Sequence, residues 1–125
     1  MRDLLLVLDV GNTNTVVGVF DGERLATHWR LTTQSERTAD EIGMWIRQLL
    51  GSEDIDPGRL LGVAVSSVVP PMDPRLLEGI RRYVGHEPFF VEPGIKTGMP
   101  LRVDAPQELG ADRLCDAVAA YAAYG

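Results

Sequence analysis

Hydrophobic and polar positions in the first quarter of the chain predict three β-strands. The uninterrupted apolar run Leu4–Leu8 ends at Asp9 and is typical of a strand buried on both faces. Residues 15–20 form a second apolar run, and the Asp21-Gly22 pair that follows is a strong hairpin signal. Alternation over residues 24–31 predicts a third strand, one face of which carries Leu25, Thr27, Trp29 and Leu31. Three strands joined by tight turns predict an antiparallel meander.

Helical spacing follows the meander. Thr38 and Glu41 stand three residues apart, the spacing of a capping box, and predict the start of a helix. Its apolar stripe recurs at i, i+3, i+4 and i+7, and we expect Gly51 to end it. Asp73 as cap and Pro74 in the first turn predict a second helix, which Gly85 would end.

Two further strands and a last helix complete the pattern. Strands are predicted over residues 60–67 and 88–91, and a Gly- and Pro-rich loop over 93–106 is long enough to suggest a function. Gly110 opens a final helix, whose apolar stripe is Leu114, Val118 and Tyr121. The order β-β-β-α-β-α-β-α predicts an α/β fold, a ribonuclease-H-like mixed sheet with flanking helices. This is one half of the actin and sugar-kinase superfamily fold, in which ATP clefts lie between two such halves.

Composition narrows the classes of partner. The 125 residues, 45% hydrophobic and 24% charged, suit one globular domain, and the net charge of −6 argues against nucleic acid or an anionic membrane as partner. The single cysteine, Cys115, has no partner for an internal disulfide, and no apolar run is long enough for a membrane span or signal peptide. We therefore expect a cytoplasmic protein.

The first candidate site is the acidic end of the first strand and the turn after it. Asp9 is followed by Gly11, which permits a tight turn, and by small amide and hydroxyl residues up to Thr15. Backbone N–H groups of such a turn can hold phosphate oxygens, with Asp9 binding Mg²⁺ through water. The alternative is a plain hairpin turn, in which Asn and Thr side chains satisfy their own backbone.

The second candidate site is Gly110-Ala111-Asp112-Arg113 at the start of the last helix. A first-turn aspartate is favoured by the helix dipole, so Asp112 also has a purely structural interpretation. Arg113 opposes the dipole there, which suggests that its guanidinium meets a ligand anion such as a carboxylate. Ser66-Ser67 after a strand and Lys96-Thr97-Gly98 in the long loop are weaker candidates.

Several stretches together resemble the type III pantothenate kinase family. They arrive in that family's order and spacing, and they are Leu8–Thr15, Val65–Pro70, Gly94–Pro100, Gly110–Arg113 and Ala117–Tyr121. The resemblance implies transfer of the γ-phosphoryl group of ATP to the primary hydroxyl of pantothenate, the first step of coenzyme A synthesis. It also implies a homodimer that requires Mg²⁺ with ATP and a monovalent cation, K⁺ or NH₄⁺.

The resemblance assigns roles to individual residues. Asp112 would be the general base, and Gly110, Ala111 and Arg113 would join it in holding pantothenate. Val103 stands where many members carry an aromatic residue that lines the pantothenate pocket. The phosphate-binding motif would comprise Asp9, Val10, Gly11, Asn12, Thr13, Asn14, Thr15 and Val16.

The resemblance covers the N-terminal half of the family's chain. We therefore expect residues 1–125 to form an N-terminal half-domain, with the C-terminal half of the family's enzyme absent and little activity from the half alone. Two other hypotheses remain: a different kinase of the same superfamily, and a non-catalytic binding or regulatory half-fold.

Overall fold

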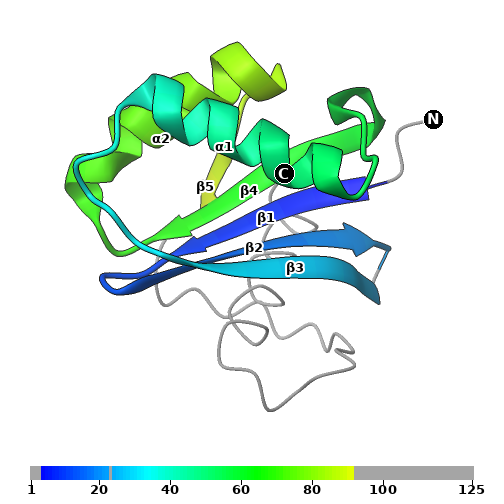
Figure 1. Cartoon of the computed structure of the whole chain (residues 1–125), viewed down its shortest axis with the longest axis horizontal. Coiled ribbons are helices and arrows are strands. Elements are labelled where there is room, and N and C mark those ends of the chain that lie inside the picture. Colours follow the sequence, from blue (N-terminus) through cyan, green and yellow to red (C-terminus); the bar gives the residue numbers. More distant parts are fainter. Residues whose placement is uncertain (1–3, 23, 92–125) are drawn as a thin grey trace.

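The computed structural model describes residues 4–22 and 24–91, which form one five-stranded mixed sheet (Figure 1). The strands are β1 (Leu4–Val10), β2 (Asn14–Asp21), β3 (Arg24–Thr32), β4 (Leu60–Ser67) and β5 (Phe89–Val91). They lie in the order β3-β2-β1-β4-β5, with β1–β2 and β2–β3 antiparallel and β1–β4 and β4–β5 parallel. The predicted meander and mixed sheet are confirmed.

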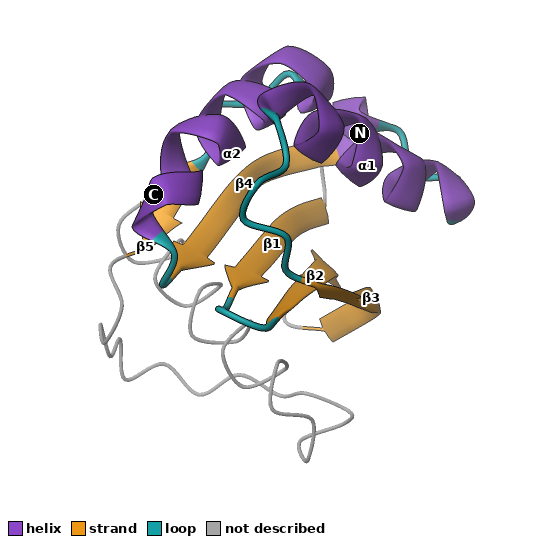
Figure 2. Cartoon of the chain, turned by 60° about the vertical axis from the view of Figure 1, so that its left-hand side comes forward, coloured by secondary structure: helices purple, strands orange, loops and turns teal. Residues whose placement is uncertain are grey.

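The helices described all lie over one face of the sheet (Figure 2). They are α1 (Ala39–Ser52), α2 (Asp73–Gly79) and the π-helical turn η3 (Ile80–Val84), with short 3-10 turns η1 (Pro57–Arg59) and η2 (Pro70–Met72). In the described ranges no helix combines the length and apolar character that a membrane span requires. The last predicted helix, the 93–106 loop and Cys115 fall outside the residues that the structure describes.

The central strand β1 is buried on both faces, as its apolar run predicts. Leu6 and Leu8 pack with α1 residues such as Ile46 on the helix side, whereas Leu5 and Val7 pack with Phe20 and Ala64 on the other side. Successive residues of a strand point to opposite faces, so β1 contributes to both parts of the core.

The sequence-based prediction for β3 is wrong at Leu25. Trp29 and Leu31 pack against the helix-side core, but Leu25 packs against the core of the opposite face. The β2–β3 register shifts where Val19 pairs with Thr27 and Phe20 pairs with Leu25, which leaves Ala26 as an extra residue. Such a bulge reverses the alternation, because side chains change face with every residue.

The end of α1 also differs from the prediction. Gly51 lies within the helix, which continues to Ser52, and Asp54 takes the left-handed conformation with φ of 55°. The N–H of Asp54 donates to Gly51 C=O and that of Ile55 to Leu50 C=O, the pattern of a Schellman motif. Aspartate tolerates this conformation better than most residues, and it takes the role expected of glycine.

The second helix begins earlier than predicted and ends where expected. The 3-10 turn η2 precedes it, so Asp73 is its first residue rather than its cap, and the preceding Met72 gives no side-chain cap. Gly85 ends the helical segment with φ of 79°, as predicted, because glycine adopts the left-handed conformation without steric cost.

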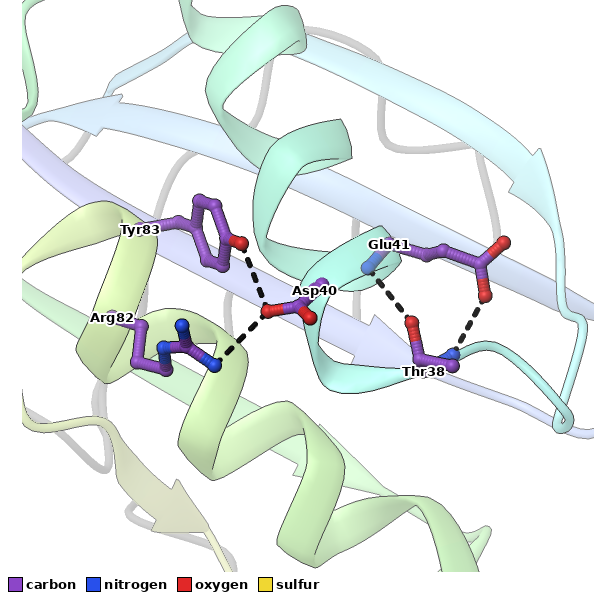
Figure 3. A network of polar contacts seen from close by, with 5 residues as sticks. All are labelled: Thr38, Asp40, Glu41, Arg82 and Tyr83. Carbon is purple, nitrogen blue, oxygen red and sulfur yellow. Dashed lines mark hydrogen bonds and ion pairs between the residues drawn. The ribbon is translucent and has the colours of Figure 1, made fainter.

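Two glycines let α1 and α2 approach closely. A Cβ atom on Gly79 would lie 2.5 Å from the Ala39 carbonyl oxygen and 3.1 Å from the Gly43 nitrogen. A polar network joins α1 to the turn η3 that follows α2 (Figure 3), in which Tyr83 Oη and Arg82 Nη1 donate to Asp40 Oδ1 over 2.8 and 3.1 Å. The hydrogen bond to Asp40 raises the pKa of Tyr83 above its ordinary value of 10.0.

The capping box at the start of α1 is confirmed (Figure 3). The Thr38 N–H donates to Glu41 Oε1 over 2.8 Å, and the Glu41 N–H donates to Thr38 Oγ1 over 3.1 Å. The Thr38 backbone N–H, and after it the Thr38 hydroxyl group, stabilise the Glu41 carboxylate and lower the pKa of Glu41 from its ordinary value of 4.5.

Candidate functional site

The candidate site lies at the carboxyl edge of the parallel strands β1 and β4. Residues 11–14 form the turn from β1 to β2, and Gly11 N–H donates to Asn14 C=O over 3.0 Å to close it. The exit of β4 is joined to the same edge, because Val68 N–H donates to Val10 C=O over 3.0 Å. Ligands of open α/β sheets bind at such carboxyl edges, where neighbouring strands lead in different directions.

Asp9 is buried within β1, one residue before the strand ends. Its side chain is 6% exposed and belongs to the face opposite the helices, the face that also carries Leu5 and Val7. Asp9 pairs in register with Val16 of β2 and Ser66 of β4. A carboxylate at this depth requires hydrogen bonds or a cation, because desolvation of an unpaired charge is costly.

The 11–14 turn presents polar groups to solvent. Asn12, Thr13 and Asn14 are exposed, and among the described residues their side chains form no hydrogen bond. Gly11 N–H is used to close the turn, which leaves the N–H groups of Asn12 and Thr13 as its candidate anion donors.

The other members of the predicted phosphate motif are buried. Val10 is fully buried on the helix side, and Val16 is 5% exposed on the side of Asp9. Thr15 is also 5% exposed, and its Oγ1 lies 2.8 Å from Thr33 Oγ1 in hydrogen-bond contact. The structure therefore brings all eight residues together but exposes only the middle of the motif.

The two serines at the end of β4 differ in role. Ser67 is buried, and its Oγ accepts a hydrogen bond from Val69 N–H over 3.1 Å, which stabilises the strand exit. Ser66 is half-buried and shares a register position and a face with Asp9. Ser66 is thus the serine placed to contribute a hydroxyl to the site.

A depression of about 500 Å³ adjoins the turn along the β3–α1 loop. It is lined by Thr33, Gln34, Ser35, Glu36, Arg37 and Glu41. The Arg37 guanidinium lies 4.8 Å from the centre of the Trp45 ring, and its buried Nε has no hydrogen-bond acceptor among the described residues. Glu36 and Glu41 bring negative charge to the same depression, so its lining has no single sign.

Thr33 is the site residue that the sequence analysis missed. Its N–H donates to Thr13 C=O over 2.8 Å, in addition to the hydroxyl contact with Thr15. Neither its residue type nor a local motif marks it. Only the register of β2 against β3, which depends on the bulge, brings it to the turn.

The second predicted site lies outside the described residues. Val103 and the Gly110, Ala111, Asp112, Arg113 motif all follow residue 91, as does Lys96-Thr97-Gly98. Among residues 4–22 and 24–91, no three His, Cys, Asp or Glu side chains gather closely enough to form a metal centre by themselves.

The strand order and the mixed pairing define the class of fold, a ribonuclease-H-like α/β sheet with helices on one face. The hexokinase of the ROK group from Thermus thermophilus matches 71% of this chain and 35% of its own, with a TM-score of 0.56 and 18% identity. RuvC from the same organism, solved with a Holliday junction, matches 99% of this chain and 97% of its own at a TM-score of 0.59 and 18% identity. At such identities these similarities establish the fold alone.

The family follows from the sequence comparisons. The family model described as type III pantothenate kinase matches residues 5–125, and the chain belongs to that family. The type III pantothenate kinase of Myxococcus xanthus is 52% identical over 118 residues, which are 94% of this chain and 46% of the relative. That of Moorella thermoacetica is 46% identical over 122 residues, 98% of this chain and 48% of the relative. The chain thus spans about half the length of these curated relatives.

Proposed function

We propose that this chain supplies the phosphate-binding turn and the catalytic base of an enzyme that phosphorylates pantothenate with ATP. The observation that carries the proposal is a buried aspartate, Asp9, at the carboxyl edge of β1, beside an exposed turn in which the Asn12 and Thr13 N–H groups have no backbone acceptor within residues 4–22 and 24–91. Family membership supports pantothenate as the acceptor, since the relatives are named type III pantothenate kinase. Residues 1–125 would form the N-terminal half-domain of that enzyme.

The donor groups at this edge suit a magnesium–phosphate complex. Asp9 offers carboxylate oxygens and Ser66 a hydroxyl in the neighbouring strand, and hard oxygen donors are the ligands that Mg²⁺ prefers. Asp9 would hold the ion through water, while Asn12 and Thr13 N–H groups bind phosphoryl oxygens. When bound, Mg²⁺ neutralises charge on the β- and γ-phosphoryl oxygens of ATP.

The acceptor side of the reaction is assigned to the motif at residues 110–113. A primary alcohol is a weak nucleophile, so a carboxylate must accept its proton as the phosphoryl group transfers, and we assign this role to Asp112. Arg113 would bind the pantothenate carboxylate through its planar donor pair, with Gly110, Ala111 and Val103 beside the substrate. We also propose that the enzyme requires K⁺ or NH₄⁺, that it is a homodimer and that it is located in the cytoplasm.

The test is pantothenate phosphorylation by MgATP, made on the longest natural product of the gene and measured as ADP release and as the mass of 4′-phosphopantothenate, with K⁺ or Na⁺ as the salt. We expect Asp9→Asn to lower kcat/KM for MgATP by about 100-fold, the scale of losing one positioned electrostatic contact. The matched control is Asp21→Asn, an exposed aspartate at the opposite end of β2, which should leave turnover within about twofold. Equal loss of MgATP and pantothenate affinity in Asp9→Asn, with lowered stability, would make Asp9 a structural residue.

The acceptor side is tested in the same assay. Asp112→Asn should lower kcat by roughly 10²–10⁴-fold, the usual contribution of a positioned general base, without a change in thermal stability. Unchanged turnover would remove Asp112 from the mechanism. Binding of MgATP with no phosphorylation of pantothenate by the wild-type protein would favour the non-catalytic half-fold instead.

A further inference from the structure

Thr33 lies directly after β3 and contacts the β1–β2 hairpin at two points. Its N–H donates to the Thr13 carbonyl oxygen within the 11–14 turn, over 2.8 Å. Its hydroxyl oxygen lies 2.8 Å from that of Thr15, which belongs to β2. One residue from outside the hairpin is therefore joined both to the turn and to the strand that follows the turn.

The backbone contact fixes the orientation of a peptide group in the turn. The peptide between Thr13 and Asn14 is planar and trans, so its carbonyl oxygen and its N–H point in opposite directions. Because Thr33 binds the carbonyl oxygen on the β3 side, the Asn14 N–H is directed away from β3. The Asn14 carbonyl then accepts from Gly11 N–H over 3.0 Å, which closes the turn.

The hydroxyl contact anchors the start of β2 from the core side. Thr15 is 5% exposed and, with Thr33, borders a cavity of about 10 Å³ whose floor is apolar and includes Val10 and Ile46. A cavity of this size is at the lower limit for one water molecule, and most of its lining is apolar, with Gln34 and Arg37 as polar members besides the threonines. Removal of the Thr33 hydroxyl would take away the side-chain partner that the Thr15 hydroxyl has among the described residues.

We infer that Thr33 is a positioning residue for nucleotide binding, which holds the 11–14 turn in its phosphate-binding shape from outside the motif. The inference rests on the proposed function of the turn. Without the Thr33 hydroxyl, the hairpin relieves the unsatisfied Thr15 hydroxyl by shifting, and MgATP must reverse that shift when it binds. The cost falls on nucleotide affinity rather than on pantothenate affinity.

The experiment compares Thr33→Val and Thr33→Ser, made in the longest natural product of the gene, by calorimetric titration with MgATP and by steady-state kinetics. Valine keeps the shape and the backbone N–H, and we expect it to weaken MgATP binding about tenfold, which corresponds to about 1.4 kcal/mol. The KM for pantothenate and kcat should change by less than about twofold. Serine should restore the wild-type affinity. In Thr15→Val/Thr33→Val no hydroxyl is left unsatisfied, so MgATP should bind more tightly than in Thr33→Val alone.

A matched control is Thr27→Val, the same substitution on β3 at a position paired with Val19, away from the turn. It should leave MgATP affinity unchanged. Loss of stability in Thr33→Val with unchanged MgATP affinity would overturn the inference, as would failure of serine to restore binding. Calorimetry with MgATP needs no pantothenate, so it tests Thr33 separately from the proposed acceptor. If MgATP binds and its affinity depends on Thr33, but pantothenate is not phosphorylated, the role of Thr33 is supported and the proposed acceptor is refuted. Absence of MgATP binding by the wild-type protein would overturn both.

Discussion

Replacement of Gly79 by alanine tests the close crossing of α1 and α2. The new Cβ would lie 2.5 Å from the Ala39 carbonyl oxygen and 3.1 Å from the Gly43 nitrogen, and neither backbone atom can rotate away. The helices must separate, and overpacking of this kind costs about 1–3 kcal/mol. Alanine returns up to about 1 kcal/mol through its higher helix propensity. Both clashing atoms are backbone, so the upper part of that cost applies, and the net expectation is a loss of about 2 kcal/mol in the free energy of unfolding.

The matched control is Gly51→Ala in α1, where no atom of the described residues, apart from the adjacent backbone of α1 itself, lies within 4 Å of the added Cβ. Because only helix propensity changes, the free energy of unfolding of this variant should rise by about 0.5–1 kcal/mol. Urea unfolding followed by far-UV circular dichroism measures both, and equal m values confirm that the midpoints report stability. The two substitutions are expected to move the midpoint in opposite directions. A Gly79→Ala variant at least as stable as the wild type would refute the described approach of the two helices.

Two further predictions concern helix ends. The pKa of Glu41 is lowered in the folded state, so the contribution of its carboxylate to stability is present above pH 4.5 and is lost as pH falls through the folded-state pKa. The stability difference between wild type and Glu41→Gln, measured from urea midpoints, should therefore shrink between about pH 5.5 and pH 3. A difference independent of pH would contradict the capping contact. Gly85→Ala places a Cβ at φ of 79° and should cost about 1 kcal/mol in the same assay, whereas an unchanged midpoint would show that the left-handed conformation is not required there.

Local signals predicted those parts of the fold that depend on neighbouring residues. The apolar run over residues 60–67 matches β4 at both ends, and the Thr38 and Glu41 pair forms the expected capping box. The prediction that α1 ends at Gly51 was wrong, because a glycine inside a helix lowers stability by only about 1 kcal/mol and does not force the helix to end. Asp54 instead takes the left-handed conformation that follows α1, and the backbone hydrogen bonds that close the helix there cannot be predicted from residue types.

The site was predicted only as far as it is continuous in sequence. Asp9 and the turn after it form one stretch, so their juxtaposition could be inferred from the motif. The contribution of Thr33 depends on pairing. The register set by Asp21 and Arg24, if it continued without a bulge, would place Thr32 opposite Thr13. The extra residue, Ala26, moves this register by one and brings Thr33 there instead. A bulge has no reliable signature in a single sequence.

The position of β1 in the sheet explains why its end is suited to bind a ligand. β1 pairs antiparallel with β2 on one side and parallel with β4 on the other, so the chain turns back after Val10 on one side while β4 leaves toward η2 on the other. The two faces of β1 have different roles. Helix-side residues such as Val10 pack in the core between the sheet and the helices, and Asp9 lies on the opposite face. Because successive side chains point to opposite faces, the end of β1 supplies both Val10, which is fixed in the core, and the Asp9 carboxylate beside the 11–14 turn. A one-residue slip of β1 would bury the Asp9 carboxylate under α1, so the core packing of β1 itself fixes which face carries the candidate chemistry.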